Sequence, residues 1–115
     1  MRWVVGLLLS TVVVALPVPP VNGTQEVGER LLLDNEHMTV VEYIFPPGFR
    51  GEEHAAIANE LAYVLEGEFA VVTRGRDKRV VRKGEVEFAA KGTIHLSVNE
   101  TRKPARVLVV LLKER

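Results

Sequence analysis

Three side chains in this sequence could together bind a metal ion, and they are His54, Glu60 and His95. The chain contains no cysteine, so every metal ligand must be a nitrogen or an oxygen atom. Two imidazoles and one carboxylate suit divalent iron, manganese, zinc, nickel or copper. The three residues therefore predict a transition-metal site, although a single histidine at the end of a strand is more often packed or exposed than a ligand.

The spacing of these residues indicates how they could meet. His54 and Glu60 are six positions apart, and in an extended segment residues separated by an even number share one face. We therefore expect both side chains to leave the same face of a sheet. His95 follows turn signals at Gly84 and Gly92, and it could supply a third donor from across a barrel.

Short strands separated by turns are expected to position these side chains. The sequence has no window typical of a long amphipathic helix, and from residue 30 onward apolar or β-branched runs alternate with turn residues. The expected strands cover residues 31–33, 38–45, 61–65, 69–73, 80–81, 86–88, 94–98 and 107–112. The last run is continuously apolar, which predicts a strand buried on both faces. This spacing of strands predicts an all-β, single-domain jelly-roll β-barrel.

Length and charge limit the size and the partners of the protein. With 115 residues, 47% of them hydrophobic and 6% aromatic, the chain can form one domain with one modest core. Fifteen Lys and Arg balance fifteen Asp and Glu, so the chain lacks the positive excess that nucleic-acid binding requires. The basic cluster at residues 74–83 is expected to be a solvated hairpin. We therefore expect no nucleic-acid partner.

Residues 1–23 have the composition of a cleaved secretory signal peptide. An uncharged, mostly apolar stretch at residues 3–16 follows Arg2, and three prolines come directly after it. The stretch is short for a membrane span, so an uncleaved anchor is the less favoured alternative, as is a buried element of the domain. Cleavage before Thr24 would release residues 24–115 as an exported domain, periplasmic or extracellular, without a membrane partner. Lacking disulfides, such a domain would gain stability from a closed barrel or a homodimer.

Two glycine-framed motifs enclose the candidate ligands and resemble those of the cupin superfamily. The first family motif has Gly, His, His, Glu and Gly at fixed spacing, and its counterparts here are Gly48, His54, Ala56, Glu60 and Gly67. The second has Gly, Pro, Gly, His and Asn, with counterparts Gly84, Ala90, Gly92, His95 and Asn99. All spacings agree, and one residue departs in each motif. The flanking strands extend the resemblance over essentially all of residues 24–115.

The resemblance implies a small barrel, usually dimeric, in which His54, Glu60 and His95 would be three of the four ligands of a metal near the mouth. Ala56 stands where the fourth ligand, a histidine, belongs, and this departure leaves two alternatives. In the first, the two His and one Glu hold a divalent metal (Fe, Mn, Zn or Ni) in the facial arrangement of non-haem iron sites, beside a small-molecule ligand. The protein could then be a dioxygenase-like enzyme. In the second, it is a metal-free module that binds a small molecule or a sugar without catalysis.

Other side chains near the motifs are expected to be structural. The four phenylalanines, Phe45, Phe49, Phe69 and Phe88, are expected in the core or in a pocket wall. Asn99 is expected to fix the end of its strand rather than touch a ligand. Glu52 has the parity of His54 and could replace the missing ligand, although its place before a turn favours exposure.

Overall fold

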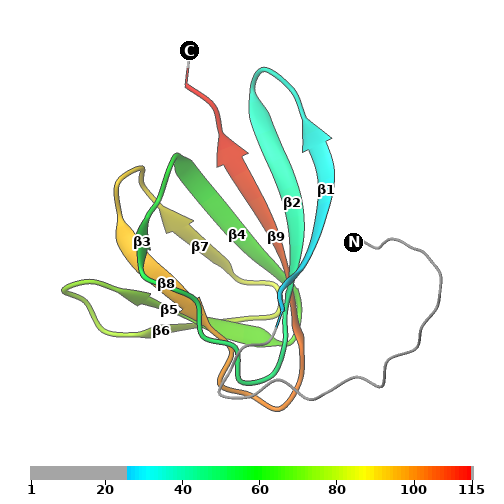
Figure 1. Cartoon of the computed structure of the whole chain (residues 1–115), viewed down its shortest axis with the longest axis vertical. Helices are drawn as coiled ribbons and strands as arrows, with labels where there is room; N and C mark the ends of the chain where they lie inside the picture. Colours follow the sequence, from blue (N-terminus) through cyan, green and yellow to red (C-terminus); the bar gives the residue numbers. More distant parts are fainter. Residues whose placement is uncertain (1–25, 115) are drawn as a thin grey trace.

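The protein folds as nine strands in the computed structural model, which describes residues 26–114 (Figure 1). The expected all-β jelly-roll fold is confirmed, and the described range contains no helix that could span a membrane. The signal peptide expected at residues 1–23 lies outside the described residues. The strands are β1 (Gly28–Asp34), β2 (Met38–Phe45), β3 (His54–Ala55), β4 (Asn59–Glu66), β5 (Glu68–Thr73), β6 (Arg79–Arg82), β7 (Val86–Ala89), β8 (Ile94–Val98) and β9 (Ala105–Leu112).

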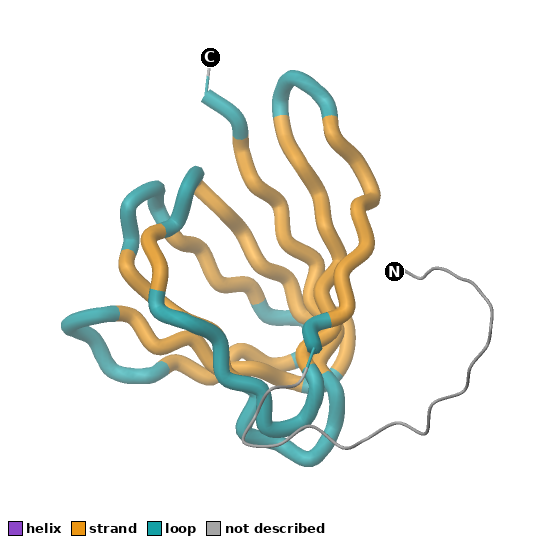
Figure 2. The backbone as a smooth tube through the Cα atoms, viewed as in Figure 1, coloured by secondary structure: helices purple, strands orange, loops and turns teal. Residues whose placement is uncertain are grey.

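The strands form two sheets that pack as layers. The five-stranded sheet has the order β1-β2-β9-β4-β7 and the four-stranded sheet has the order β3-β8-β5-β6, with every pairing antiparallel. Figure 2 shows the two layers meeting at one end and opening at the other. Each sheet therefore has an inner face toward the other layer and an outer face.

The main core fills the closed end between the inner faces. Phe45 from the five-stranded sheet stacks on Phe69 from the other sheet, with ring centroids 5.5 Å apart. Phe45 also stacks on the half-buried Phe49, at 5.2 Å. Three of the four phenylalanines therefore lie where the sequence predicted. The remaining buried members of this core are Val64, Val71, Val81, Ala105 and Val107.

The outer face of the five-stranded sheet differs from expectation. β9 lies between β2 and β4, and its Val107 is fully buried, but Leu112 is 41% exposed. The prediction that residues 107–112 are buried on both faces is therefore wrong, because no described element covers the outer face. Phe88 does not lie in the core either: it pairs with Leu61 on this outer face, is 56% exposed and lines only a surface pocket near the edge of the sheet.

Asn99 fixes the loops at the closed end, as the sequence predicted. Its fully buried amide nitrogen donates to the carbonyl oxygens of Phe45 and Lys103, and its amide oxygen accepts from the backbone and the hydroxyl of Thr101. Its backbone also exchanges hydrogen bonds with Gly48 and Phe49. One buried side chain therefore anchors the loop that leads to His54.

Candidate metal and ligand site

A cavity of about 670 Å³ lies between the two sheets. Its apolar walls come mainly from β2, β9 and the loop after β2, and they include Tyr43, Phe45, Phe49, Val109 and Leu111. The candidate ligands His54, Glu60 and His95 also line it. The three residues singled out by the sequence thus share one cavity.

The two histidines face each other on neighbouring strands. His54 on β3 pairs directly with His95 on β8, and their rings meet edge to face with centroids 4.9 Å apart. Nδ1 of His54 lies 3.0 Å from the carbonyl oxygen of Glu52. Because a carbonyl can only accept, this contact favours the tautomer that carries hydrogen on Nδ1 and leaves the Nε2 lone pair free. His54 is exposed, whereas His95 is 7% exposed.

Glu60 approaches from the opposite sheet. Its Oε2 lies 3.6 Å from Nε2 of His95, although Glu60 is on β4 of the five-stranded sheet and His95 is on the four-stranded sheet. The expectation that His54 and Glu60 leave the same face of one extended segment is therefore wrong. A bend at residues 57–58 carries the chain from one sheet to the other, so these two side chains reach the cavity from opposite layers.

Burial perturbs both members of the Glu60–His95 pair toward their neutral forms. Desolvation raises the pKa of Glu60 above its ordinary value, and His54 partly opposes this shift. Desolvation also lowers the pKa of His95, and His54 lowers it further, whereas Glu87 acts in the opposite direction. Both shifts therefore favour the neutral form of the side chain, the protonated acid for Glu60 and the neutral imidazole for His95.

The charged side chains around the cavity favour a cation. Three carboxylates line it, from Glu29, Glu52 and Glu60, against one guanidinium, from Arg50. The pKa of Tyr43 is raised by burial and then by the charges of Glu29 and Glu60, which is the effect expected of a negative field. A divalent metal ion would neutralise this excess.

The donor types fit a divalent transition metal, but the side chains do not form a finished ligand set. Among residues 26–114, no three His, Cys, Asp or Glu side chains are arranged to hold a metal ion. Ala56 contributes a buried methyl group, and Glu52 is exposed and contacts His54 through its backbone. Metal binding would therefore require movement of side chains, for which the exposed His54 has room.

Comparison with known proteins identifies the family. Residues 41–111 match the family described as Cupin domain. The chain belongs to the cupin family. This assignment confirms the resemblance carried by the two glycine-framed motifs.

Relatives of this cupin include named oxidoreductases. The cupin-domain-containing oxidoreductase srdB of Neurospora crassa is 35% identical over 69 residues, which cover 59% of this chain and 35% of that protein. A second such oxidoreductase from the same organism, srdD, is 34% identical over 71 residues, 59% of this chain and 36% of its own length. The chain thus spans little more than a third of either curated relative.

Solved structures share the fold. An RmlC-like cupin from Methanocaldococcus jannaschii superposes with a TM-score of 0.71 at 14% identity, covering 80% of this cupin and 84% of that chain. An RmlC-like cupin from Shewanella frigidimarina gives a TM-score of 0.67 at 25% identity, with 77% and 78% covered. The two-layered arrangement is therefore that of known cupins.

Several residues of the cavity were not predicted from the sequence. Tyr43 and Glu29 come from β2 and β1, outside both motifs, and Arg50 comes from the loop between β2 and β3. Tyr43 shares the parity of Phe45 on β2, which could have placed it on the inner face. No sequence pattern identified Glu29 or Arg50.

Proposed function

We propose that this cupin binds a divalent transition metal through His54, Glu60 and His95, and a small organic molecule beside it. The observation that carries the proposal is the convergence of these three side chains, from β3, β4 and β8, on one cavity with an excess of carboxylates. The donor set suits iron, manganese, zinc or nickel.

The residues of this chain would divide the work between holding the metal and holding the molecule. His54 would present Nε2, because its Nδ1 is engaged by the Glu52 carbonyl. Tyr43, Phe49 and Leu111 would exclude water from the apolar part of the bound molecule. A bound iron(II) would supply dioxygen-dependent oxidation, the reaction class we propose because the curated relatives are named oxidoreductases.

A metal-free binding module is the second candidate. Ala56 lacks a donor atom, and the described residues contain no finished set of three ligands. In this case the cavity would bind a small molecule or a sugar, without catalysis.

Metal analysis of the untagged protein distinguishes the two candidates. We expect about one equivalent of bound metal, reduced to background by His54→Ala or Glu60→Ala. His37→Ala is the matched control, because His37 is an exposed histidine of the β1–β2 turn outside the cavity, and it should leave the metal content unchanged. A protein free of metal, with a melting temperature unmoved by iron, manganese, zinc and nickel, would contradict the metal site and leave the metal-free module as the candidate.

We also propose that the protein is exported and forms a homodimer. The proposal of export rests on the composition of residues 1–23. Mass spectrometry of the protein recovered outside the cytoplasm tests it, and we expect the mass of residues 24–115. A mass equal to that of the chain from Met1 would contradict cleavage. The proposed homodimer rests on the apolar outer face of the five-stranded sheet.

A further inference from the structure

A second, smaller cavity lies beside the site. Its volume is about 40 Å³, enough for one ordered water molecule, which occupies roughly 30 Å³ in the liquid. Glu60, Glu87, His95 and Ser97 line it together with apolar side chains of the core. A water in such a space requires two or more polar partners, and this lining supplies them.

His95, which lines both cavities, has an unsatisfied ring nitrogen. Nδ1 of His95 is the one buried side-chain nitrogen or oxygen without a hydrogen-bond partner among the described residues. Leaving a buried polar atom unpaired costs about 1–3 kcal/mol, so native proteins rarely do so. A histidine that presents one ring nitrogen to a site usually donates its other N–H to a carboxylate, a carbonyl or a water.

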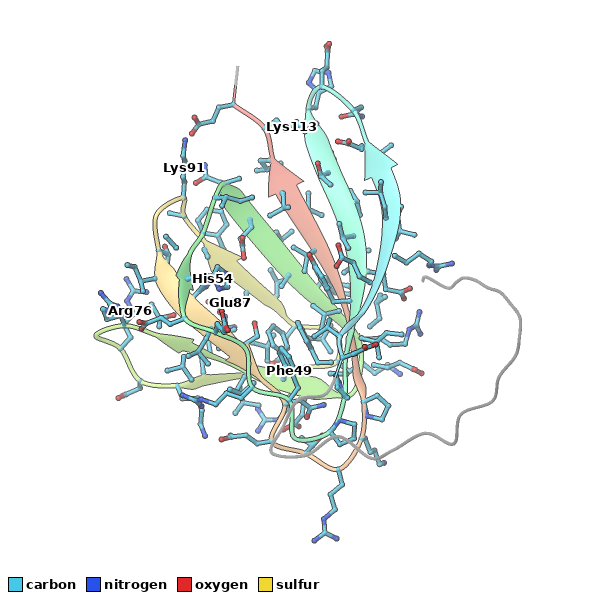
Figure 3. The ribbon with its side chains drawn as sticks, viewed as in Figure 1. Phe49, His54, Arg76, Glu87, Lys91 and Lys113 are labelled. Carbon is cyan, nitrogen blue, oxygen red and sulfur yellow. The ribbon has the colours of Figure 1, made fainter. Side chains whose placement is uncertain are left out.

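Glu87 provides an acceptor that is already held in place. It lies on the inner face of β7, its side chain is 16% exposed, and Figure 3 shows it directed into the space between the sheets. Arg79 from β6 forms an ion pair with Oε1 of this carboxylate across the edges of the two sheets. An ionised carboxylate accepts several hydrogen bonds, so Glu87 keeps capacity toward the interior.

We propose that the small cavity binds one water molecule, which accepts the Nδ1 hydrogen of His95 and donates to the carboxylate of Glu87. Glu87 is then a positioning residue: through the water it fixes the His95 tautomer that carries hydrogen on Nδ1. Nε2 of His95 then carries a lone pair and is left free for a ligand in the larger cavity. The arrangement concerns the metal-free protein, so it goes beyond the proposed function and does not depend on it.

The tautomer of His95 can be read directly by NMR. We expect long-range ¹H–¹⁵N correlations of the metal-free protein, recorded where the ring is neutral, to show hydrogen on Nδ1. In Glu87→Leu the tautomer with hydrogen on Nδ1 should no longer predominate, because the water loses the carboxylate that accepts its hydrogen bond. Glu87→Gln should restore it, since an amide oxygen still accepts.

Arg79→Leu is the matched control. It breaks the same ion pair as Glu87→Leu but leaves the carboxylate, so the Nδ1–H tautomer should persist. A wild-type ring with hydrogen on Nε2 would overturn the proposal, and this result needs no variant to fold. An equal change of tautomer in Glu87→Leu and Arg79→Leu would overturn it as well, because the ion pair rather than the acceptor would then be responsible.

Discussion

Position 56 has alanine where the first motif has its second histidine. Ala56 follows His54 by two positions. Its backbone N–H donates to the carbonyl of Thr93, and this hydrogen bond places Ala56 next to the paired strands β3 and β8. Ala56 shares the parity of His54 and is 3% exposed. An imidazole here would therefore lie near the His54–His95 pair.

We expect Ala56→His to raise metal affinity at least about tenfold, since each added imidazole ligand contributes to the stability of the complex. Competition with a chelator measures this change. Ala55→His is the control, because the neighbouring position points to the opposite face and should leave affinity unchanged. Equal affinities for wild type and Ala56→His would show that the side chains do not converge.

Glu42 is a buried carboxylate whose charge is matched by two arginines. It is 6% exposed, and its oxygens lie 3.1 Å from Arg30 and 2.6 Å from Arg106. The hydrogen bond from Arg106 holds the pKa of Glu42 below its ordinary value of 4.5, despite desolvation. Ionised Glu42 therefore contributes stability above pH 4.5, and this contribution is lost as pH falls through the lower pKa of the folded state.

We expect Glu42→Gln to lower the free energy of unfolding by about 1–3 kcal/mol at neutral pH, because the two guanidinium groups lose their anionic partner. The difference from wild type should shrink as the pH falls below 4.5. Urea denaturation at a series of pH values measures both effects. A difference independent of pH would mean that packing, not charge, stabilises this position.

At the scale of elements, most strands could be predicted because their sequences are periodic or strongly apolar. The expected strand at residues 38–45 coincides with β2, and that at residues 94–98 with β8. β3 was missed because two residues cannot show a period. The change of sheet before Glu60 was also missed, because the bend at residues 57–58 contains neither glycine nor proline. The motifs therefore identified the site residues, but not the layers from which they come.

Two turn glycines, one from each motif, differ in how well they tolerate a side chain. Gly67 and Gly84 both have positive φ, +74° and +83°, which disfavours other residues. A Cβ at Gly67 would lie 2.5 Å from the carbonyl oxygen of Pro104, whereas a Cβ at Gly84 meets no atom within 4 Å. Only Gly67 therefore has a steric requirement beyond its backbone conformation.

We expect Gly84→Ala to cost about 1 kcal/mol, the usual penalty of the left-handed conformation. Gly67→Ala should cost at least about 2 kcal/mol more, because the β4–β5 turn must move away from the loop before β9. Thermal and urea unfolding of both variants give the comparison. Equal losses would mean that this contact relaxes without cost.

The outer face of the five-stranded sheet is an apolar surface that residues 26–114 leave uncovered. One row of paired residues crosses all five strands: Leu33, Val40, Val110, Leu61 and Phe88. The charges on this face are paired within it, Glu42 with Arg30 and Arg106, and Arg106 also with Glu66. These two acids and two bases cancel, so a second copy of the same face would meet no net charge.

The dimensions of the sheet agree with a dimer. Five strands spaced about 4.8 Å apart, on average about seven residues long, give a face of roughly 570 Å². Two such faces bury about 1,100 Å² in total, near the lower limit for a specific interface. We therefore expect two copies to pack through this outer face in a two-fold arrangement, in which each apolar row meets its counterpart.

Light scattering during size-exclusion chromatography tests this interface. Wild type should elute as a dimer, and Phe88→Asp should weaken the dimer at least about a hundredfold, because it buries a charge within the apolar contact of the two outer faces. Ile57→Asp is the control, since Ile57 is 77% exposed but lies at the cavity instead of on the outer face. Circular dichroism should show intact strands in both variants. A wild-type monomer at all concentrations, or a dimer indifferent to Phe88→Asp, would assign the outer face another role.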